Sequence, residues 1–496
     1  MEFDVPQVQL SGIAPEIVLA AAALLLLVVD AVAGKRLPHW ALAAGSTVAL
    51  VLAGFFAVEA WGSNELQLEG MVAADGFAVF VKITLATFAL LTVWLGRDHL
   101  AGLDEPEFYG LVLFATAGMM LMASAADLIM MFLALETFSL ALYVLVAFRR
   151  RSLTAQESAM KYFLLGAFSS AFFLLGIALV YGAVGSTNLY GAGGEAGRAG
   201  IVEFLRTTPT EDVTLLFLAT GLLIVGLAFK VAAVPFHMWT PDAYQGAPSP
   251  VTGFMAAGSK IAGFAALIRL LDAALFSLRW DWQPLLAALA VATMVAGSVL
   301  AVVQEDVKRL LAYSSIAHAG FVMTAVIAAN DRGVSGSLFY LATYGISVLG
   351  AFAVVAVLGG SEERRVRLTD YRGVFFERPL LAGAFSLFLL SLAGVPLTSG
   401  FVAKLVVFGA AVDAGYTWLV VVGMLSSAVA AFFYLRIMVV MYMQERDPAA
   451  PAVRVPVLSG GVIGLTAATT IVLGLAWGPL IDVAEKATFF FNVAGG

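Results

Sequence analysis

The chain has 496 residues, of which 61% are hydrophobic and only 12% are charged. A soluble domain carries about a quarter charged residues, so this composition excludes an ordinary soluble protein. The absence of cysteine excludes disulfides, thiolate-bound zinc and cysteine-ligated iron–sulfur clusters. The net charge of −7 indicates little, because in a membrane protein the placement of the basic residues carries the information. The composition predicts an all-α integral membrane protein.

Long apolar runs follow one another along the chain, and each predicts a membrane-spanning helix of about 20 residues. The first run, Ile13–Val32, has no basic segment before it and no evident small-residue cleavage site, so it is interpreted as the first helix and not as a signal peptide. The fourteen predicted spans are 13–33, 40–61, 71–95, 108–124, 126–147, 158–184, 213–236, 249–271, 285–303, 310–329, 335–358, 380–412, 417–443 and 457–480. The longest loops, 185–212 and 359–379, leave no room for a soluble domain.

Two of these spans contain a helix breaker. Span 12 is too long for one straight crossing and contains Gly394-Val395-Pro396, and span 7 contains Ala233-Val234-Pro235. Both spans are therefore predicted to be discontinuous. Each breaker falls in the fourth member of a group of five spans, and proline-interrupted helices at corresponding positions are the usual sequence pointer to an ion site.

The two groups of five spans predict an internal repeat. Because five is an odd number, the second group should lie inverted relative to the first, as in inverted-repeat transporters. The chain then divides into residues 1–105 with helices 1–3, residues 106–272 with the first repeat (helices 4–8), residues 273–443 with the inverted second repeat (helices 9–13), and residues 444–496 with helix 14 and the C-terminal tail.

The basic residues predict the orientation, since short cytoplasmic loops are enriched in Lys and Arg. With the N-terminus outside, fifteen of the 27 Lys and Arg residues fall in inward loops and five in outward loops. This bias predicts that both termini lie on the outer side of the cell inner (plasma) membrane. The inward residues are Lys35, Arg36, Arg97, Arg149, Arg150, Arg151, Lys308, Arg309, Arg364, Arg365, Arg367, Arg372, Arg378, Arg446 and Arg454. The outward residues are Arg198, Arg206, Arg279, Arg332 and Lys486.

Several charged residues fall inside the predicted spans, where a charge at the bilayer centre costs about 2.5–3.5 kcal/mol on insertion scales. Tolerating them requires pairing, hydration or loss of the charge. Lysine suits a proton relay because it can give up its proton on burial, whereas arginine stays charged. The basic residues are Lys82, Lys161, Lys230, Lys260, Arg269, Lys404 and Arg436. Glu136 lies near the centre of span 5 and supplies a carboxylate that could pair with a lysine.

Not all of these residues need a functional reading. Arg269 and Arg436 lie toward span ends and are interpreted as snorkelling to the interface. Lys161 sits one turn inside span 6, where snorkelling and a functional role are both open. Lys82 could instead make a structural contact to Asp75 or Glu59. The deeper residues Lys230, Lys260 and Glu136 favour a functional reading.

The histidines and the remaining motifs are less informative. His318 could be a relay group or a satisfied structural histidine, and His237, beside Pro235, is interpreted as a loop anchor. The chain has no Walker A loop, so ATP-driven transport is unsupported, and its four scattered histidines do not indicate haem. The chain is expected to bind no metal, no cofactor of its own and no nucleic acid.

Three stretches resemble the antiporter-like membrane subunits of respiratory complex I. The first runs from Val234 to Tyr244 and continues through Gly246-Ala247-Pro248-Ser249-Pro250-Val251 and Ser259-Lys260. The other two, from Glu157 to Ser170 and from Gly394 to Phe401, resemble subunit N within that family. The motifs are long and specific, and the resemblance covers the chain from about span 2 to span 13.

The resemblance implies a fourteen-helix subunit without a redox centre, which pumps protons driven by quinone reduction elsewhere in the complex. It implies that Glu136 pairs with Lys230, that Lys161 modulates the pair, and that Lys260 is the central relay lysine. Lys404 would be the exit-side lysine, and His318 matches a Tyr-Ser-Ser-x-x-His pattern of span 10. The expected partners are the lipid bilayer and the other membrane and peripheral subunits, and the complex as a whole is expected to use NADH, FMN, iron–sulfur clusters and a quinone.

Three other readings remain open. A homologous subunit of a cation/proton antiporter would have the same fold and a similar row of charges. A free-standing secondary transporter for an organic solute would have a midplane pocket with polar groups specific for its substrate, whereas this sequence offers a file of lone lysines. A membrane scaffold would leave Lys230, Lys260 and Glu136 unexplained. Copurification with flavin and iron–sulfur subunits would separate the first alternative from a complex I subunit.

Overall fold

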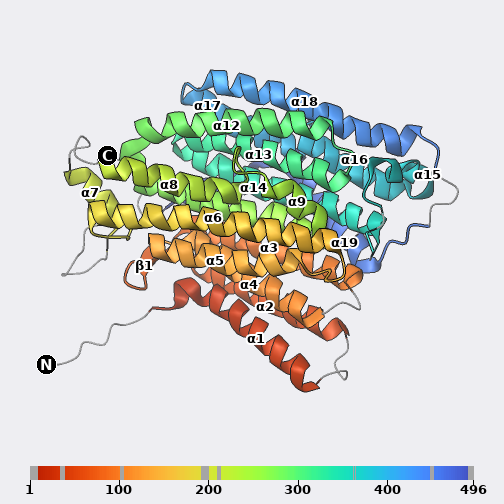
Figure 1. The fold of residues 1–496 in the computed structure, drawn as a ribbon, viewed down its shortest axis with the longest axis horizontal. Coiled ribbons are helices and arrows are strands. Elements are labelled where there is room, and N and C mark those ends of the chain that lie inside the picture. The colour runs from red at the N-terminus through yellow and green to blue at the C-terminus, as the bar shows by residue number, and fades with distance from the viewer. Residues whose placement is uncertain are drawn as a thin grey trace.

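A computed structural model of the chain describes residues 9–33, 39–100, 105–191, 200–208, 214–360, 362–363, 365–446 and 452–489. The long helices run side by side, with α1 at one side of the molecule and α18 at the other (Figure 1). Within the described residues, thirteen helices are long and apolar enough to cross a membrane. This confirms the predicted all-α membrane fold.

The elements follow the chain in two long series separated by the buried helix of span 8. The first series comprises α1 (Ala14–Ala33), α2 (His39–Glu59), β1 (Glu65–Gln67), β2 (Val72–Ala74), α3 (Gly76–His99), α4 (Glu105–Ser124), α5 (Leu128–Val146), α6 (Leu153–Val184), α7 (Ile201–Thr207), α8 (Thr214–Val231) and α9 (Trp239–Gly246). The second comprises α12 (Arg279–Val302), α13 (Val307–Ala328), α14 (Asp331–Gly359), α15 (Val374–Glu377), α16 (Pro379–Ala393), α17 (Ser399–Asp413), α18 (Thr417–Met443), α19 (Val457–Leu475) and α20 (Gly478–Lys486).

The helix of span 8 is not a uniform α-helix. It begins as α10 (Ser249–Phe254), passes through a π-helical segment at Met255–Ser259, continues as α11 (Lys260–Ile268) and ends in a second π-helical segment at Arg269–Ala274. The π-helix is rare and often occurs at functional sites. Lys260 is the first residue after the first of these segments.

Both predicted breaks have a structural counterpart. α8 ends at Val231, and Ala232 takes a left-handed conformation with φ of 63° before the chain reaches Pro235. In span 12, α16 ends at Ala393 and α17 begins at Ser399, so two helices of 15 residues each take the place of one. The inverted relation between the two groups of five helices stays a prediction.

The core is formed by the helix of span 8 together with α13 and α14. In the most apolar 18-residue stretch of the span 8 helix, 100% of the residues are buried. The same share for α13 and for α14 is 94%. The corresponding values for α1 and α18 are 28% and 33%, because these helices are apolar on all sides and expose their outer faces. A helix that is apolar all round and only partly covered by protein is suited to contact with lipid.

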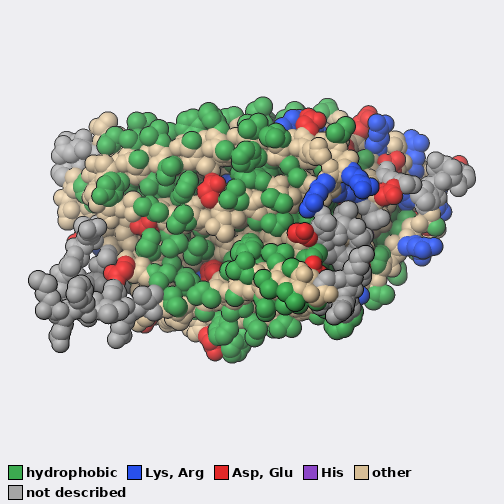
Figure 2. Space-filling model, turned by 60° about the horizontal axis from the view of Figure 1, so that its bottom comes forward, with side chains coloured by type: hydrophobic (Ala, Val, Ile, Leu, Met, Phe, Trp, Pro, Cys, Tyr) green, Lys and Arg blue, Asp and Glu red, His purple; other side chains and the backbone are tan. Residues whose placement is uncertain are grey.

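Hydrophobic and basic side chains occupy different parts of the surface. Figure 2 shows hydrophobic side chains spread over the length of the molecule, while Lys and Arg side chains gather at one end. Arg372, Arg378 and Arg446 belong to the segments around α15 and the end of α18. This gathering is the spatial counterpart of the basic loops in the sequence.

Candidate functional site

Lys230 lies in the last turn of α8 and is only 2% exposed. Its ammonium donates a hydrogen bond to the hydroxyl of Ser139 on α5 at 2.7 Å. Four aromatic rings surround the ammonium, with centroids 5.4–5.9 Å away, and such rings attract a cation. They belong to Phe138, Tyr143, Tyr162 and Phe229. Lys230 is thus enclosed by neutral groups.

Glu136 lies on α5, three residues before Ser139, and is half-buried. Its carboxylate accepts a hydrogen bond from the hydroxyl of Ser170 on α6. The negative charge of Glu136 acts on Lys230, yet among the described residues the two side chains form no ion pair. In this conformation each member of the implied pair is held by a serine, and the two serines lie on different helices.

Lys161 lies apart from these two residues. Its side chain is 46% exposed and forms ion pairs with Glu157 at 2.6 Å and with Asp242 of α9 at 3.0 Å. Asp242 also accepts from the guanidinium of Arg309 at 2.5 Å. Burial alone would raise the pKa of Asp242, but the hydrogen bonds from Arg309 and Lys161 hold that pKa below its usual value. Lys161 therefore belongs to a half-exposed ion network between α6, α9 and α13.

Lys260 is 2% exposed, and its ammonium donates to the backbone carbonyl of Ser315 on α13. The hydroxyl of Ser315 accepts a hydrogen bond from Tyr344 of α14 at 2.8 Å and lies 3.4 Å from the hydroxyl of Tyr244. Hydroxyl groups from three segments therefore meet next to the lysine. Hydroxyls can both donate and accept, which suits a chain of proton transfers.

His318 lies three residues after Ser315 on α13 and is 5% exposed. Its Nδ1 lies 2.6 Å from the hydroxyl of Tyr340, and its Nε2 lies 3.3 Å from that of Tyr434. Lys260 and Lys404 are both close enough to act on the ring electrostatically. His318 is therefore within range of the charges of both lysines.

Lys404 is positioned by the break in span 12. Its ammonium donates to the carbonyl of Ala393, the last residue of α16, at 2.8 Å and to the hydroxyl of Ser427 at 2.6 Å. It also lies 4.9 Å from the ring centroid of Phe321 on α13. Gly394 has φ of 86°, and a Cβ at this position would lie 2.8 Å from the lysine Cδ, so glycine is required here.

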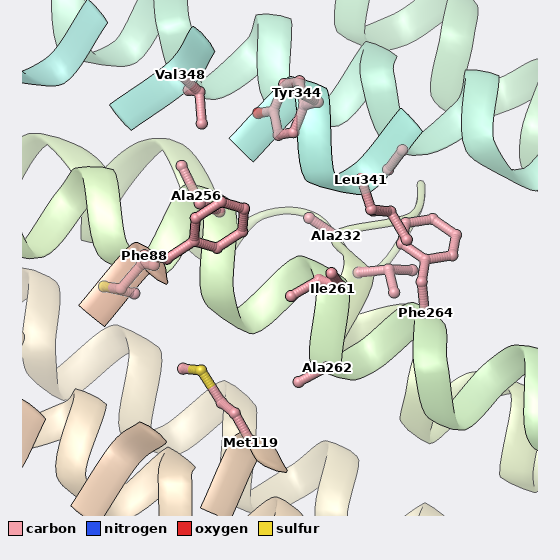
Figure 3. Close-up of a cluster of buried hydrophobic side chains, with 14 of the residues drawn as sticks. Phe88, Met119, Ala232, Ala256, Ile261, Ala262, Phe264, Leu341, Tyr344 and Val348 are labelled. Carbon is pink, nitrogen blue, oxygen red and sulfur yellow. The ribbon is translucent and has the colours of Figure 1, made fainter. Parts of the chain in front are cut away.

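The two sets of residues approach each other where α8 crosses α11. A Cβ at Gly263, three residues after Lys260, would lie 3.4 Å from the Cβ of Lys230, so the absence of a side chain allows this close approach. Figure 3 shows Ile261 and Phe264 of α11 in the same buried apolar cluster as Ala232, which follows α8. Among the described residues, no hydrogen bond links Lys230 to Lys260 across this crossing. Lys230 bonds to Ser139, and Lys260 bonds to Ser315.

Two other buried basic residues have structural partners. Arg269 was expected to snorkel, and this expectation is wrong, because its side chain is 0% exposed and bonds to both oxygens of Asp75 at 2.7 and 2.9 Å. Lys82 does make an ion pair, but with Glu16 of α1 at 2.7 Å and not with Asp75 or Glu59. Tertiary packing brings these partners together, which a local sequence pattern could not indicate.

The remaining sequence candidates lie at helix ends. Arg436 donates to the carbonyl of Val302, the last residue of α12, at 3.0 Å, which fits its position toward a span end. His237 lies in the break after α8, and its Nδ1 has no hydrogen-bond partner within the described residues. No group of His, Asp or Glu able to hold a metal ion occurs in the part of the chain that the structure describes.

Sequence reasoning missed most of the neutral groups around the candidate residues. Ser139, Ser315 and Ser427 bond directly to a buried lysine. The others bond to Glu136, to His318 or to Ser315; they are Ser170, Tyr244, Tyr340, Tyr344 and Tyr434. Isolated serines and tyrosines are common in apolar helices, so their presence alone is a weak signal. The Tyr-Ser-Ser-x-x-His motif did mark the α13 residues next to Lys260.

Comparisons with known proteins identify the relatives of this chain. Residues 125–430 match the family described as NADH:quinone oxidoreductase/Mrp antiporter, TM. The chain is 42% identical to the NADH-quinone oxidoreductase subunit N of Salinispora arenicola, over 99% of each chain. It is 49% identical to that of Rhodococcus opacus, over 78% of this chain and 70% of the relative.

Solved structures show the same likeness. A chain of respiratory complex I from Thermus thermophilus with bound aureothin has a TM-score of 0.79 and 36% identity, with 96% of this chain and 100% of that chain covered. A chain of the Mrp complex from Dietzia has a TM-score of 0.82 at 23% identity, with 96% of both chains covered, and shows the fold alone. The chain described here therefore belongs to the NADH:quinone oxidoreductase/Mrp antiporter family of membrane subunits and, within it, to the subunit N group of NADH-quinone oxidoreductase.

Proposed function

We propose that this chain moves protons across the membrane through a relay of buried side chains, driven by quinone reduction elsewhere in NADH-quinone oxidoreductase. The proposed proton-carrying residues are Glu136, Lys230, Lys260, His318 and Lys404, and Lys161 is proposed to modulate the Glu136–Lys230 pair. The observation that carries the proposal is the kind of partner each lysine has. Lys230, Lys260 and Lys404 are bonded to serine hydroxyls and backbone carbonyls. By contrast, Lys82, Arg269 and Lys308 each form an ion pair with a carboxylate.

This difference in partners separates a relay lysine from a structural one. A carboxylate stabilises the charged form of a lysine, and Lys82 has such a partner in Glu16. A neutral acceptor in an apolar interior stabilises the charge far less. Lys230, Lys260 and Lys404 have only neutral acceptors in the described part of the chain. They can therefore gain and lose a proton with a moderate change in free energy.

The hydrogen bonds around α13 suggest how the central residues work together. A proton on Lys260 lies next to Ser315, whose hydroxyl is bonded to Tyr344. His318 lies one turn further along α13, within range of the charges of Lys260 and Lys404. Because each positive charge repels the next, protonation of one residue favours proton release from its neighbour. This coupling can pass a change in protonation from one relay residue to the next.

Lys161 takes the outermost place in this proposal. Its ammonium is bonded to Asp242, which Arg309 also holds. Nearly half of the Lys161 side chain is exposed, unlike those of the buried lysines. Its influence on Glu136 and Lys230 would pass through α6, which also carries the Ser170 that bonds to Glu136. Lys161 is therefore proposed to set the position and field of the pair and not to pass protons between buried groups.

The division of labour within the complex follows from the chemistry of this chain. NADH, FMN, iron–sulfur clusters and the quinone are proposed to be bound by other subunits, because this chain has no cysteine to ligate a cluster. Its proposed partners are the other subunits of the complex and the lipid bilayer. The alternative of a sodium-coupled antiporter subunit would be favoured only if the chain copurified without flavin and iron–sulfur subunits.

The Glu136–Lys230 pair provides the direct test. Lys230→Arg keeps the positive charge but cannot release a proton, so proton translocation per NADH oxidised should fall while the complex still assembles. The measurement is proton uptake or release by reconstituted vesicles, normalised to NADH oxidation. Lys82→Arg is the matched control, since Lys82 is also buried but is bonded to Glu16. Normal pumping by Lys230→Arg would remove Lys230 from the relay.

The orientation has its own test. Reporter fusions in the 149–156 and 361–378 loops should report the cytoplasm, and fusions in 185–212 the outside, because the basic residues cluster in the first two loops. The measurement is the activity of a reporter that works on one side of the membrane only. The opposite result in both basic loops would reverse the proposed placement of the two termini on the outer side.

A further inference from the structure

Asp272 is a buried acid that the proposed relay does not use. It lies in the π-helical segment Arg269–Ala274, at the end of the fully buried helix of span 8, and is 7% exposed. Both of its carboxyl oxygens are inaccessible and lack a hydrogen-bond partner within the described residues. A buried carboxylate without a partner is costly, so this position calls for a proton or for water on the carboxyl group.

Three other acids within the described residues pair with a cation. Glu16 pairs with Lys82, Asp75 with Arg269, and Glu363 with Lys308. Asp272 lies only three residues from Arg269, yet the arginine side chain turns to Asp75. The oxygens of Asp272 are covered by this chain itself, so a cation of a neighbouring subunit cannot reach them without a rearrangement.

Within the described residues, the segments that pack closely against this π-helical segment carry few charged groups. They are Arg269 with its partner Asp75, Lys260 at the start of α11, and Glu203 and Arg206 on α7. None of them bonds to Asp272 in the described structure. The acid is therefore free to change its protonation without breaking an ion pair.

The position of Asp272 relates it to Lys260. The two residues lie twelve positions apart on the same helix, or about 18 Å at the rise of an α-helix. Phe264 and Ile268 lie between them at four-residue intervals, which places apolar side chains along the connecting face. At the other end of this helix the first N–H, of Ser249, donates to Glu363.

The two ends of the helix differ in their chemistry. Burial alone would raise the pKa of Glu363, but the charge and hydrogen bond of Lys308 hold that pKa below its usual value. That end therefore keeps a fixed charge pair. Asp272, at the other end, has no such partner in the described residues and lies where α7, the short helix of the 185–212 loop, packs on span 8.

We propose that Asp272 is a further proton-accepting site of this subunit, which takes up protons that come from Lys260 and releases them at the α7 end of the molecule. This inference rests on the proposed function. In balanced form, the ammonium of Lys260 gives one proton to water, water gives one to the carboxylate of Asp272, and the carboxylic acid later returns it to water outside; no electron moves. Transfer past Phe264 and Ile268 requires water to enter between them during the cycle.

The test uses the intact complex reconstituted in vesicles, with NADH and a quinone as substrates. Asp272→Asn keeps the size of the side chain but cannot carry the proton, so the number of protons moved per NADH should fall. Asp272→Glu keeps the acid and should restore most of the pumping. Asp281→Asn is the matched control, because Asp281 is an exposed acid in the first turn of α12. That variant should pump like the wild type.

Infrared difference spectroscopy of the same samples gives a second readout. The wild type should show a carbonyl band of a protonated carboxylic acid that changes during turnover, that is lost in Asp272→Asn and that shifts in Asp272→Glu. If Asp272→Asn fails to assemble, the band in the wild type and in Asp272→Glu decides.

The outcomes separate this inference from the relay itself. Normal pumping by Asp272→Asn, or a spectrum that this variant leaves unchanged, would overturn the role of Asp272. If Lys260→Met abolishes pumping while Asp272→Asn pumps normally, only the present inference fails. If Lys260→Met also pumps normally, the proposed function fails with it.

Discussion

Replacing Lys260 by methionine is expected to abolish the proton translocation that depends on this subunit, while the chain still folds and inserts. Methionine has a similar length and no charge, so the variant keeps the packing around α11 but has no group that can carry a proton. A positioned proton-transfer group commonly contributes 10²–10⁴-fold to a rate, so the flux should fall by roughly a hundredfold or more. Losing an ammonium held by one carbonyl leaves no buried charge unpaired, so stability should change little.

The measurement is the proton flux into vesicles at a fixed rate of NADH oxidation, together with the thermal stability of the purified complex. Lys486→Met is the matched control, because Lys486 is an exposed lysine at the end of α20. The control should pump like the wild type. A Lys260→Met complex that pumps at the wild-type rate would contradict the central role of this lysine, whatever its stability.

Replacing Arg269 by alanine is expected to have the largest effect on stability. The side chain is 0% exposed, donates to both oxygens of Asp75 and also to the carbonyl of Ala123, so it ties α3, α4 and span 8 together. Removing one partner of a buried ion pair typically costs about 3–5 kcal/mol, because the other charge is left buried without compensation. The variant should give much less assembled complex and unfold at a lower temperature.

A double substitution distinguishes the ion pair from the packing. Asp75→Asn with Arg269→Met removes both charges, and the amide oxygen of asparagine can still accept from the N–H of Ala78 at the start of α3. The double variant should recover part of the stability that Arg269→Ala loses. The exposed pair Arg332–Asp413 is the control, because surface pairs contribute about 0–1 kcal/mol. Equal losses at both sites would contradict the structural role of Arg269.

The positions of the spans could be predicted because the length and hydrophobicity of a span are local properties of the sequence. The breaks at Ala233-Val234-Pro235 and Gly394-Val395-Pro396 were predictable for the same reason. The π-helical segments beside Lys260 and Asp272 were not, since no residue pattern in this sequence marks an i→i+5 turn. They depend on how span 8 packs against its neighbours.

The partner of each buried charge was beyond local reasoning. Lys82 and Lys230 look alike in the sequence, each a lone lysine in an apolar run. One meets Glu16 and the other Ser139, and only the packing of distant helices decides this. The surroundings of Lys161 could not be predicted from the sequence either. α6 begins at Leu153, five residues before the predicted start, and the side chain of Lys161 is half-exposed.

The hydrogen bond from Lys404 to Ala393 joins the two half-helices of span 12 across the break. The carbonyl of Ala393 ends α16, where the helix dipole is negative, and the ammonium of Lys404 belongs to α17, so a proton on this lysine holds the two half-helices together. If Lys404 releases its proton, as the proposed relay requires, this charge attraction between the two half-helices is lost. Span 12 would therefore convert the arrival and departure of a proton into movement of the backbone, which a continuous helix with the same lysine could not do.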